Sequence, residues 1–375
     1  MRSPIITLST PIMANEQYQK GKIKLLYTKS KVKKAGENIR KCKNIEESTE
    51  IIRNFRAAHL YPLMIIKNLL DKHTKKTEVN ALIARRLKRL PTIIDKLQRK
   101  TLDGKTPNSI AVSNMCDIGG CRVIVDNKDE LNRLFSSLKS SLAGKRTKHK
   151  LKYDANYIQN KKPTGYRSIH LIYECFDKDD GHDWKGFKIE VQLRTKLQHL
   201  WATTVEVVDL CEGKSLKTNP FDSDPNWIEY FNIMSDFLAL EDGFIKLTNQ
   251  EKDTMKNRLI YLDRKLRARS KLLSFRNLFS GQYTEIPKSS KYVVLAINEK
   301  ENKVYYQSFS SRKKEEALEW YSRVEDDLEF NGVFIHMDDV SKIQIAYPNY
   351  LIDTREFIRK YDYYIKSSYW INPRE

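Results

Sequence analysis

The stretch IEVQLRT, residues 189–195, alternates apolar and polar side chains and constrains the fold more than any other segment. Successive side chains of a β-strand point to opposite faces, so its aliphatic residues share one face and belong to a core. The opposite face carries a carboxylate, an amide and a guanidinium in one row, namely Glu190, Gln192 and Arg194. Such a row can hold a metal ion, a base edge and a phosphate. An exposed sheet face with charged side chains gives the same pattern.

The distribution of basic charge is a second indication of the kind of ligand, because this charge is concentrated near the N-terminus. Lysine and arginine total 68 against 48 acidic residues, which gives a formal charge of +20. Residues 1–110 contribute +16, from 25 basic and nine acidic side chains, whereas residues 215–375 are neutral. This distribution favours a polyanionic ligand, either nucleotide phosphates or a nucleic-acid backbone. A solvated, lysine-rich helical face is the alternative explanation.

Missing motifs exclude several function classes. The sequence contains no GxxxxGK[ST] phosphate loop and no GxGxxG turn, so neither a P-loop nor a dinucleotide-binding fold is expected. Its five cysteines form no CxxC pair, which argues against a disulfide framework or zinc ribbon and indicates a reducing cytoplasm. No uninterrupted apolar stretch approaches 18 residues, so we expect no transmembrane helix and no membrane partner.

The spacing of apolar residues predicts an α/β (α+β) chain. Apolar residues recur at helical spacing across 15–100, including a basic helix over 80–100. Shorter β-branched or alternating runs then predict strands. The predicted strands are 118–125, one that follows the basic loop 144–152, 168–176 and 187–193, and the helices after them are 196–210, 226–240 and 251–278.

A change of composition at SGQYTEIPKSSK predicts a linker, beyond which lies a small α+β module. The module is predicted to contain strands 292–297, 304–309 and 333–336, a helix 313–328 and two closing helices. Its near-neutral charge favours protein contact or regulation. The predicted parts of the chain are a basic N-terminal extension 1–39, a core 40–245, a helical connector 246–285 and a C-terminal module 286–375.

Two further segments carry polar residues suited to ligand binding. In KKPTGYRSIH a tight loop leads into a strand, and a period of two places Tyr166 and His170 on one face. This ring can stack on a nucleobase, although a rim aromatic and a core histidine are the structural alternatives. In CDIGGCRVIV, Asp117 precedes a buried strand and Arg122 interrupts it. An isolated cation in an apolar run requires an anion, a π-face or an edge position.

In this order the segments resemble the RelA/SpoT-type (p)ppGpp synthetase domain, over roughly residues 40–245. Residues 86–96 look like that family's RxKxxxSIxxK segment, and 117–123 like its D(L/I)xGxRV strand. Residues 157–170 are similar to its guanosine loop, and 190–195 to its ExQ(I/L)RT strand. The N-terminal third lacks the histidine pattern of a hydrolase domain. The chain therefore looks like a stand-alone small alarmone synthetase or a toxic relative of one.

The resemblance implies a mixed β-sheet, nucleotidyltransferase-like synthetase core flanked by helices. It implies transfer of the β,γ-pyrophosphate of ATP to the 3′-hydroxyl of GDP or GTP, with Mg²⁺ as cofactor. Asp117 and Glu190 would be the catalytic residues and the metal ligands, and Glu190 would deprotonate the hydroxyl. The residues implied for ATP are Arg86, Lys88, Lys96 and Arg122. Those implied for the acceptor are Lys162, Tyr166, Arg167, His170, Gln192 and Arg194, with Tyr166 stacked on the base.

Departures from the family pattern leave the acceptor open. The family's loop proline is Lys161 here, and its Lys-Asp pair falls on Ala155 and Asn156. Some relatives are toxins that pyrophosphorylate the 3′ CCA end of tRNA, and the basic N-terminal third suits that substrate. A tRNA-modifying toxin or phage-defence enzyme is therefore the second hypothesis. A catalytically inactive nucleotide sensor is the third, against which the retained acidic residues argue. A second copy of the chain, and an antitoxin or regulatory protein at the C-terminal module, are the protein partners considered.

Overall fold

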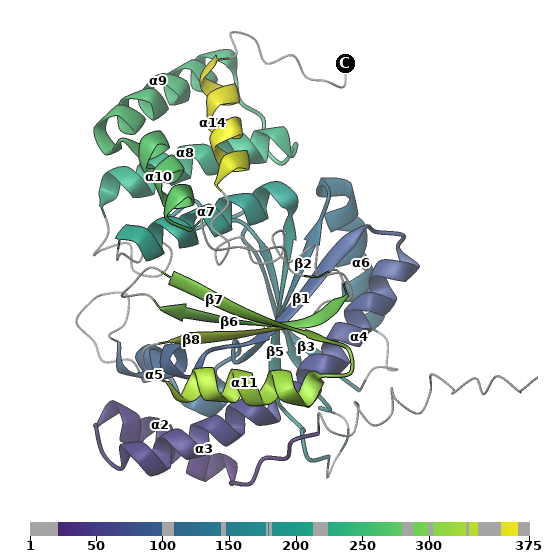
Figure 1. Ribbon diagram of the computed structural model, residues 1–375. Helices are drawn as coiled ribbons and strands as arrows, with labels where there is room; N and C mark the ends of the chain where they lie inside the picture. Colours follow the sequence, from purple (N-terminus) through teal and green to yellow (C-terminus); the bar gives the residue numbers. More distant parts are fainter. Residues whose placement is uncertain are drawn as a thin grey trace, which may run out of the picture.

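Two β-sheets organise the part of the chain that the structure describes (Figure 1). The computed structural model describes residues 22–99, 109–143, 148–177, 179, 182–212, 224–279, 287, 289–298, 303–327, 330–336 and 354–366. The larger sheet has the strand order β1-β2-β5-β4-β3, and the smaller one has the order β7-β6-β8. In the larger sheet β2 and β5 are parallel, whereas the other neighbours are antiparallel. This mixed sheet confirms the predicted α/β (α+β) class.

The strands of the larger sheet are β1 (Ala81–Leu87), β2 (Gly119–Val125), β3 (Lys150–Asn156), β4 (Ile169–Glu174) and β5 (Lys188–Thr195). The helices before the small sheet are α2 (Lys29–Arg40), α3 (Ile45–Ala58), α4 (Leu60–Lys76), α5 (Leu90–Gln98), α6 (Lys128–Ala143), α7 (Lys196–Glu212), α8 (Pro225–Glu241), α9 (Asn249–Leu266) and α10 (Ala268–Phe279), with a 3₁₀ turn at Val112–Asn114. The remaining elements are β6 (Ser290–Asn298), β7 (Lys303–Ser310), α11 (Lys314–Asp326), β8 (Asn331–His336) and α14 (Arg355–Lys366).

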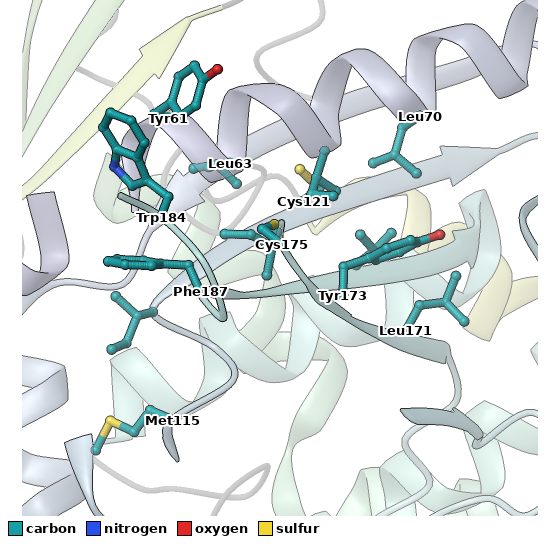
Figure 2. Packing of buried hydrophobic residues seen from close by; sticks show 14 of the residues in the cluster. Tyr61, Leu63, Leu70, Met115, Cys121, Leu171, Tyr173, Cys175, Trp184 and Phe187 are labelled. Atoms are coloured by element: carbon teal, nitrogen blue, oxygen red, sulfur yellow. The ribbon is translucent and has the colours of Figure 1, made fainter. Parts of the chain in front are cut away.

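The alternation of apolar and polar residues in β5 buries the aliphatic face of the strand, as predicted. Ile189, Val191 and Leu193 are fully buried in one hydrophobic cluster, to which Cys121 and Tyr173 of the neighbouring strands also belong (Figure 2). Complete burial of each aliphatic side chain contributes about 1.5–3 kcal/mol. A one-residue slip of the strand would expose all three, so this face fixes the register that presents the polar residues on the other side.

The predicted basic helix over 80–100 is wrong in its first half. Residues Ala81–Leu87 form β1, which pairs antiparallel with β2, and helix α5 begins only at Leu90, with Pro91 in its first turn. Ladder hydrogen bonds to a buried neighbouring strand outweigh the small differences in local propensity that favour a helix.

The predicted boundary at residue 39 is also displaced. Helix α2 packs on α3 and α5, and its Val32 and Ile39 are buried in the same cluster as β5. A helix with a buried face belongs to the core that covers it, so the core includes residues from Lys29 onward. Residues 1–21 of the predicted extension lie outside the described part of the chain.

The C-terminal module divides into two pieces. Strands β6, β7 and β8 and helix α11 confirm the predicted secondary structure to within one or two residues. Helix α14, however, packs on α7, α9 and α10, with Phe357 and Tyr364 fully buried there (Figure 1). The structure describes one of the two predicted closing helices, and residues 337–353 and 367–375 lie outside the described part of the chain. The smaller sheet itself meets the core where β8 lies beside β1 and where Arg56 donates a 2.6 Å hydrogen bond to the Tyr321 hydroxyl.

Among the helices that the structure describes, none combines the length and apolar character that crossing a bilayer requires.

Candidate active site

The strand register brings polar residues from distant segments to one face of the sheet. Glu190 on β5 stands opposite Gly120 on β2, and Gln192 stands opposite Arg122. On the other side of β5, His170 of β4 is opposite Gln192. Paired residues of neighbouring strands project from the same face, so these side chains form one continuous polar surface. The row that the alternation predicts on β5 therefore extends over three strands.

A pocket opens on this surface beside β1 and β2. It has about 610 Å³ of empty volume, including the solvent at its mouth. The residues that line it are Ala84, Arg85, Arg86, Lys88, Asp117, Gly120, Cys121, Arg122, Glu190 and Gln192. Six of the residues predicted for ATP, metal or acceptor are thus gathered around one cavity.

Asp117 is held between two lysines. The Nζ of Lys88 lies 3.1 Å from Asp117 Oδ2, and the Nζ of Lys96 on α5 lies 2.9 and 2.8 Å from the two carboxylate oxygens. Burial alone would raise the pKa of Asp117, but the two ammonium groups outweigh burial and lower it to about 2. Asp117 is therefore ionised at neutral pH. Lys96, which was predicted to bind ATP, contacts the site through this carboxylate.

The position of Lys88 depends on a residue that the sequence did not single out. Arg56 of α3 is only 4% exposed, and its Nε donates a 2.6 Å hydrogen bond to the Lys88 carbonyl oxygen. The Lys88 amide in turn donates to the Ile118 carbonyl oxygen at 2.7 Å. These bonds fix the backbone where β1 ends. A buried arginine inside an otherwise ordinary amphipathic helix carries no local signal of this function.

Glu190 is the second carboxylate, and two side chains donate to it. The Nδ1 of His170 lies 3.1 Å from Glu190 Oε1, and the Nε2 of Gln192 donates to Oε2 at 2.8 Å. Burial alone would raise the pKa of Glu190, but the interactions with His170 and the hydrogen bond from Gln192 together outweigh burial and keep the pKa below the ordinary 4.5. Burial lowers the pKa of His170, so its ring is neutral at pH 7. An ionised, hydrogen-bonded carboxylate is thus presented to the pocket.

Arg194 supports Glu190 through two chains of hydrogen bonds. Its Nη2 donates to the Tyr166 hydroxyl at 2.7 Å and to Gln192 Oε1 at 2.6 Å, and the Tyr166 hydroxyl bonds to His170 Nε2 at 2.7 Å. Both chains end on the carboxylate of Glu190, one on each oxygen. The Arg194 side chain is completely buried. The structure therefore gives Arg194 a supporting position beneath the surface, which differs from the predicted contact with an acceptor.

The loop predicted to take the acceptor base buries its central ring. Tyr166 is 3% exposed and meets Trp201, Tyr157 and His170 edge to face. The Nζ of Lys162 lies over two rings, 4.5 Å from the centroid of Tyr157 and 5.2 Å from that of Tyr166. Tyr157 is the more exposed of the two rings. Stacking of a base on Tyr166 therefore stays a prediction that requires its ring to become exposed.

Arg167 points away from this surface. Its side chain is buried, and its guanidinium donates to Asp236 Oδ1 at 2.7 Å, to Ser235 Oγ at 3.2 Å and to the Ile158 carbonyl oxygen at 2.7 Å. Each of the three guanidinium nitrogens donates within the protein, so the structure assigns Arg167 to holding the loop. The sequence predicts that Arg167 contacts the acceptor. In the structure its anionic partner is instead Asp236 of helix α8.

The donor set fits a magnesium ion that is also held by substrate phosphates. Mg²⁺ prefers carboxylate oxygens and is usually bound through one or two of them, with phosphates and water completing its octahedron. Asp117 and Glu190 supply two ionised carboxylates to one pocket. Within the described ranges no group of three or more His, Cys, Asp or Glu side chains could hold a metal by itself. The protein alone therefore offers part of a coordination shell.

Part of this fold matches a known family model. Residues 85–207 match the model of the region found in RelA/SpoT proteins, which confirms the resemblance of the motifs over this part of the chain. GTP pyrophosphokinase YwaC of Bacillus subtilis (strain 168) is 31% identical over 118 residues. That match covers 32% of this chain and 52% of the relative, about half of its length.

Solved structures of small alarmone synthetases are also similar. Small alarmone synthetase 1 of Bacillus subtilis aligns with a TM-score of 0.39 and 18% identity, covering 51% of this chain and 92% of the other. Small alarmone synthetase 2 of the same organism gives 0.40 and 20%, with coverages of 51% and 94%. The first of these enzymes has also been solved bound to its product pppGpp.

Gly120 offers a direct test of the pocket. A Cβ at this position would make ordinary contact, with its nearest atom, the Glu190 carbonyl oxygen, 3.7 Å away. Gly120→Val should therefore fold normally but fill the pocket and weaken ATP binding by about 10–100-fold, which corresponds to about 1–3 kcal/mol of steric cost. Isothermal titration with ATP measures this effect.

Gly119 provides the contrasting variant. A Cβ there would lie 2.7 Å from Ile189 Cδ1 in the core. Gly119→Ala should lower the melting temperature, because a buried isoleucine must move. If Gly120→Val bound ATP as tightly as the wild type, this cavity would not be the ATP site.

Proposed function

We propose that the protein is a pyrophosphokinase that transfers the β,γ-pyrophosphate of ATP to the 3′-hydroxyl of a guanosine nucleotide, GDP or GTP. The observation that carries the proposal is the pairing of two ionised carboxylates, Asp117 and Glu190, with a cationic wall in one pocket. The pocket is built almost wholly from the region that matches the RelA/SpoT model. Transfer of this kind depends mainly on positioning and charge neutralisation, which such a site supplies.

The reaction assigns a separate task to each carboxylate. The 3′-oxygen of the acceptor attacks the β-phosphorus of ATP, the bond between that phosphorus and the bridging oxygen of the α-phosphate breaks, and AMP leaves. Glu190 accepts the proton of the 3′-hydroxyl, for which its low pKa and the supporting hydrogen bonds keep it ionised. Mg²⁺, when bound at Asp117 and Glu190, would neutralise charge on the transferred phosphates.

The cationic residues bind and orient the triphosphate. Lys88 and Lys96 lie against Asp117, so they can exchange this carboxylate for phosphate oxygens without leaving the site. Arg86 and Arg122 line the same pocket and present planar guanidinium groups suited to stacking on adenine. Lys162, held over two rings at the acceptor side, is placed to contact the phosphates of the acceptor.

The reaction products test this proposal. With ATP, Mg²⁺ and GDP, separation of the nucleotides by ion-exchange chromatography should show AMP and a tetraphosphorylated guanosine in equal amounts. Formation of ADP instead would indicate transfer of a single phosphate. AMP formed without any acceptor product would indicate hydrolysis, and either result would contradict the proposed reaction.

A tRNA acceptor is the second candidate, and the charge of α2 favours it. This helix and the turn after it carry exposed lysines on the surface, namely Lys29, Lys31, Lys33, Lys34, Lys41 and Lys43. A concentration of cations on an exposed helix attracts a polyphosphate backbone more than it attracts a single nucleotide. In that case the same transfer chemistry would modify the 3′ end of tRNA.

The salt dependence of acceptor affinity distinguishes tRNA from a free guanosine nucleotide. If tRNA is the acceptor and about five phosphates contact the basic surface, its apparent affinity should fall by about 10²–10³ between roughly 50 and 200 mM salt. The affinity for GDP should fall far less, because a nucleotide engages only the pocket. The measurement is the dependence of KM on NaCl concentration for each acceptor. A flat salt profile for tRNA would contradict docking on α2.

A further inference from the structure

The loop 161–167, which would hold the acceptor, rests on a helix outside the matched region. Helix α8 begins at Pro225, after the RelA/SpoT match ends at residue 207. Asn232, Ser235 and Asp236 of this helix are spaced three and four residues apart, so they share one face. All three face the loop and hydrogen-bond to it.

Lys161 makes the most concentrated of these contacts. Its Nζ donates to Asn232 Oδ1 at 2.6 Å and reaches both Asp236 oxygens, at 2.7 and 2.6 Å. The two side chains of this ion pair are only 31% and 21% exposed, so solvent screens the pair incompletely. Arg167, at the other end of the loop, donates to the same carboxylate at 2.7 Å. Asp236 therefore closes the loop by binding a cation at each of its ends.

Backbone contacts between the two cations hold the middle of the loop. Asn232 Nδ2 donates to the Pro163 carbonyl oxygen at 2.7 Å, and Ser235 Oγ donates to the Gly165 carbonyl oxygen at 2.6 Å. Gly165 has a φ of +91°, and a Cβ there would lie 3.0 Å from the Asn232 Cα. Only glycine allows this close approach. The loop is thus seated on α8 along its whole length.

Helix α8 is itself fixed, as an anchor must be. Its Glu241 accepts a 2.6 Å hydrogen bond from the Tyr364 hydroxyl and pairs with Lys360, both on α14. Phe231 packs against Phe357 of the same helix, with ring centroids 5.7 Å apart. The loop is therefore attached to an immobile surface, and the positions of Lys162 and Tyr166 follow from that attachment.

From this geometry we infer that Lys161 and Asp236 form a latch that fixes the acceptor loop and sets the affinity for the acceptor. Lys161 acts as a positioning residue, because its ammonium group is hydrogen-bonded to Asn232 and Asp236 of α8. The latch rests on the proposed function for its effect on catalysis. Its structural part, the restraint of the loop, is independent of which acceptor is used.

The test compares Lys161→Met with Arg258→Met, which breaks an ion pair between α9 and Glu229 of α8. Lys161→Met should raise KM for the acceptor about 10-fold or more, while KM for ATP stays within about twofold, because charge-assisted hydrogen bonds to the loop are lost. Lys161→Arg, which keeps the charge, should restore most of the acceptor affinity. Arg258→Met should change neither constant.

Hydrogen exchange supplies a readout that needs no activity. The Gly165 amide donates to the Lys162 carbonyl oxygen at 2.8 Å, and the Lys162 amide donates to the Tyr166 carbonyl oxygen at 3.2 Å. Peptides covering 158–168 should exchange about 10-fold faster in Lys161→Met and in Asp236→Asn than in Arg258→Met. Unchanged exchange, or an equal rise of both KM values, would overturn the latch. A wild type without transfer activity would refute the proposed function, and the exchange comparison would still decide the latch.

Discussion

Replacing Glu190 by glutamine should lower the rate of pyrophosphate transfer by about 10²–10⁴, the usual contribution of a general base. Glutamine has the same shape and can still accept the hydrogen bond from His170, so the network that now supports the carboxylate at 3.1 and 2.8 Å remains largely in place. It cannot accept the proton of the attacking hydroxyl. The measurement is single-turnover transfer at saturating ATP and acceptor, which separates the chemical step from binding.

Glu174→Gln is the matched control. Glu174 belongs to the neighbouring strand β4, is similarly half-buried and pairs with Lys152 at 2.8 Å. This variant should transfer at the wild-type rate.

The pH dependence of the wild-type rate follows from the pKa of Glu190, which is lowered below 4.5 in the folded protein. Glu190 therefore stays ionised down to that range, and its contribution to the rate should be lost only as the pH falls through this folded-state pKa. A Glu190→Gln variant with near wild-type rate would refute the assignment of the base.

Asp117→Asn should reduce transfer on the order of 10³-fold and leave ATP binding intact. In the proposed mechanism this carboxylate would bind Mg²⁺, and a bound metal would supply several kcal/mol of charge stabilisation in the transition state. The substitution also frees the ammonium groups of Lys88 and Lys96, now 2.8–3.1 Å from the carboxylate, which then attract the triphosphate. Binding of ATP without metal should therefore stay equal or become tighter. Titration calorimetry and the transfer assay together show this separation.

The control for this variant is Asp126→Asn. Asp126 follows the same strand β2 at its opposite end and pairs with Lys196 at 2.6 Å. Loss of one exposed ion pair should cost at most about 1 kcal/mol of stability and should not affect transfer. If Asp117→Asn lost ATP binding and transfer in equal proportion, Asp117 would act through the structure of the pocket, and its assignment as a metal ligand would be contradicted.

The parts of the site that depend on strand periodicity could be predicted from the sequence. Alternation in β5 places Glu190 and Gln192 on one face. The pairing with the neighbouring strands then places Arg122 and His170 on the same face of the sheet. Asp117 could be predicted because it directly precedes a buried strand. These features follow from a period of two and from the side on which the aliphatic residues lie, both of which are local properties of the chain.

The parts that depend on packing could not be predicted. Strand β1 was expected as a helix because its pairing with β2 is a contact across about 40 residues of sequence, beyond local propensity. Tyr166 is covered by rings distant in sequence, among them Trp201 of α7. Arg167 is bound by α8, whose acidic face gives no sign in the sequence of which loop it binds. Helix α14 was grouped with the small sheet because it follows that sheet in the chain. In the structure its apolar face covers α7, α9 and α10.

The central claim is that the two carboxylates and the cationic wall transfer pyrophosphate from ATP to a nucleotide acceptor. The most direct measurement uses γ-³²P-ATP and Mg²⁺ with GDP, GTP and deacylated tRNA as acceptors in parallel. We predict label on GDP or GTP, with release of AMP and loss of both in Glu190→Gln. Label on tRNA alone would mean that the same reaction takes place with tRNA, the second candidate, as the acceptor. Absence of label on all three, in a folded protein that binds ATP, would contradict the account.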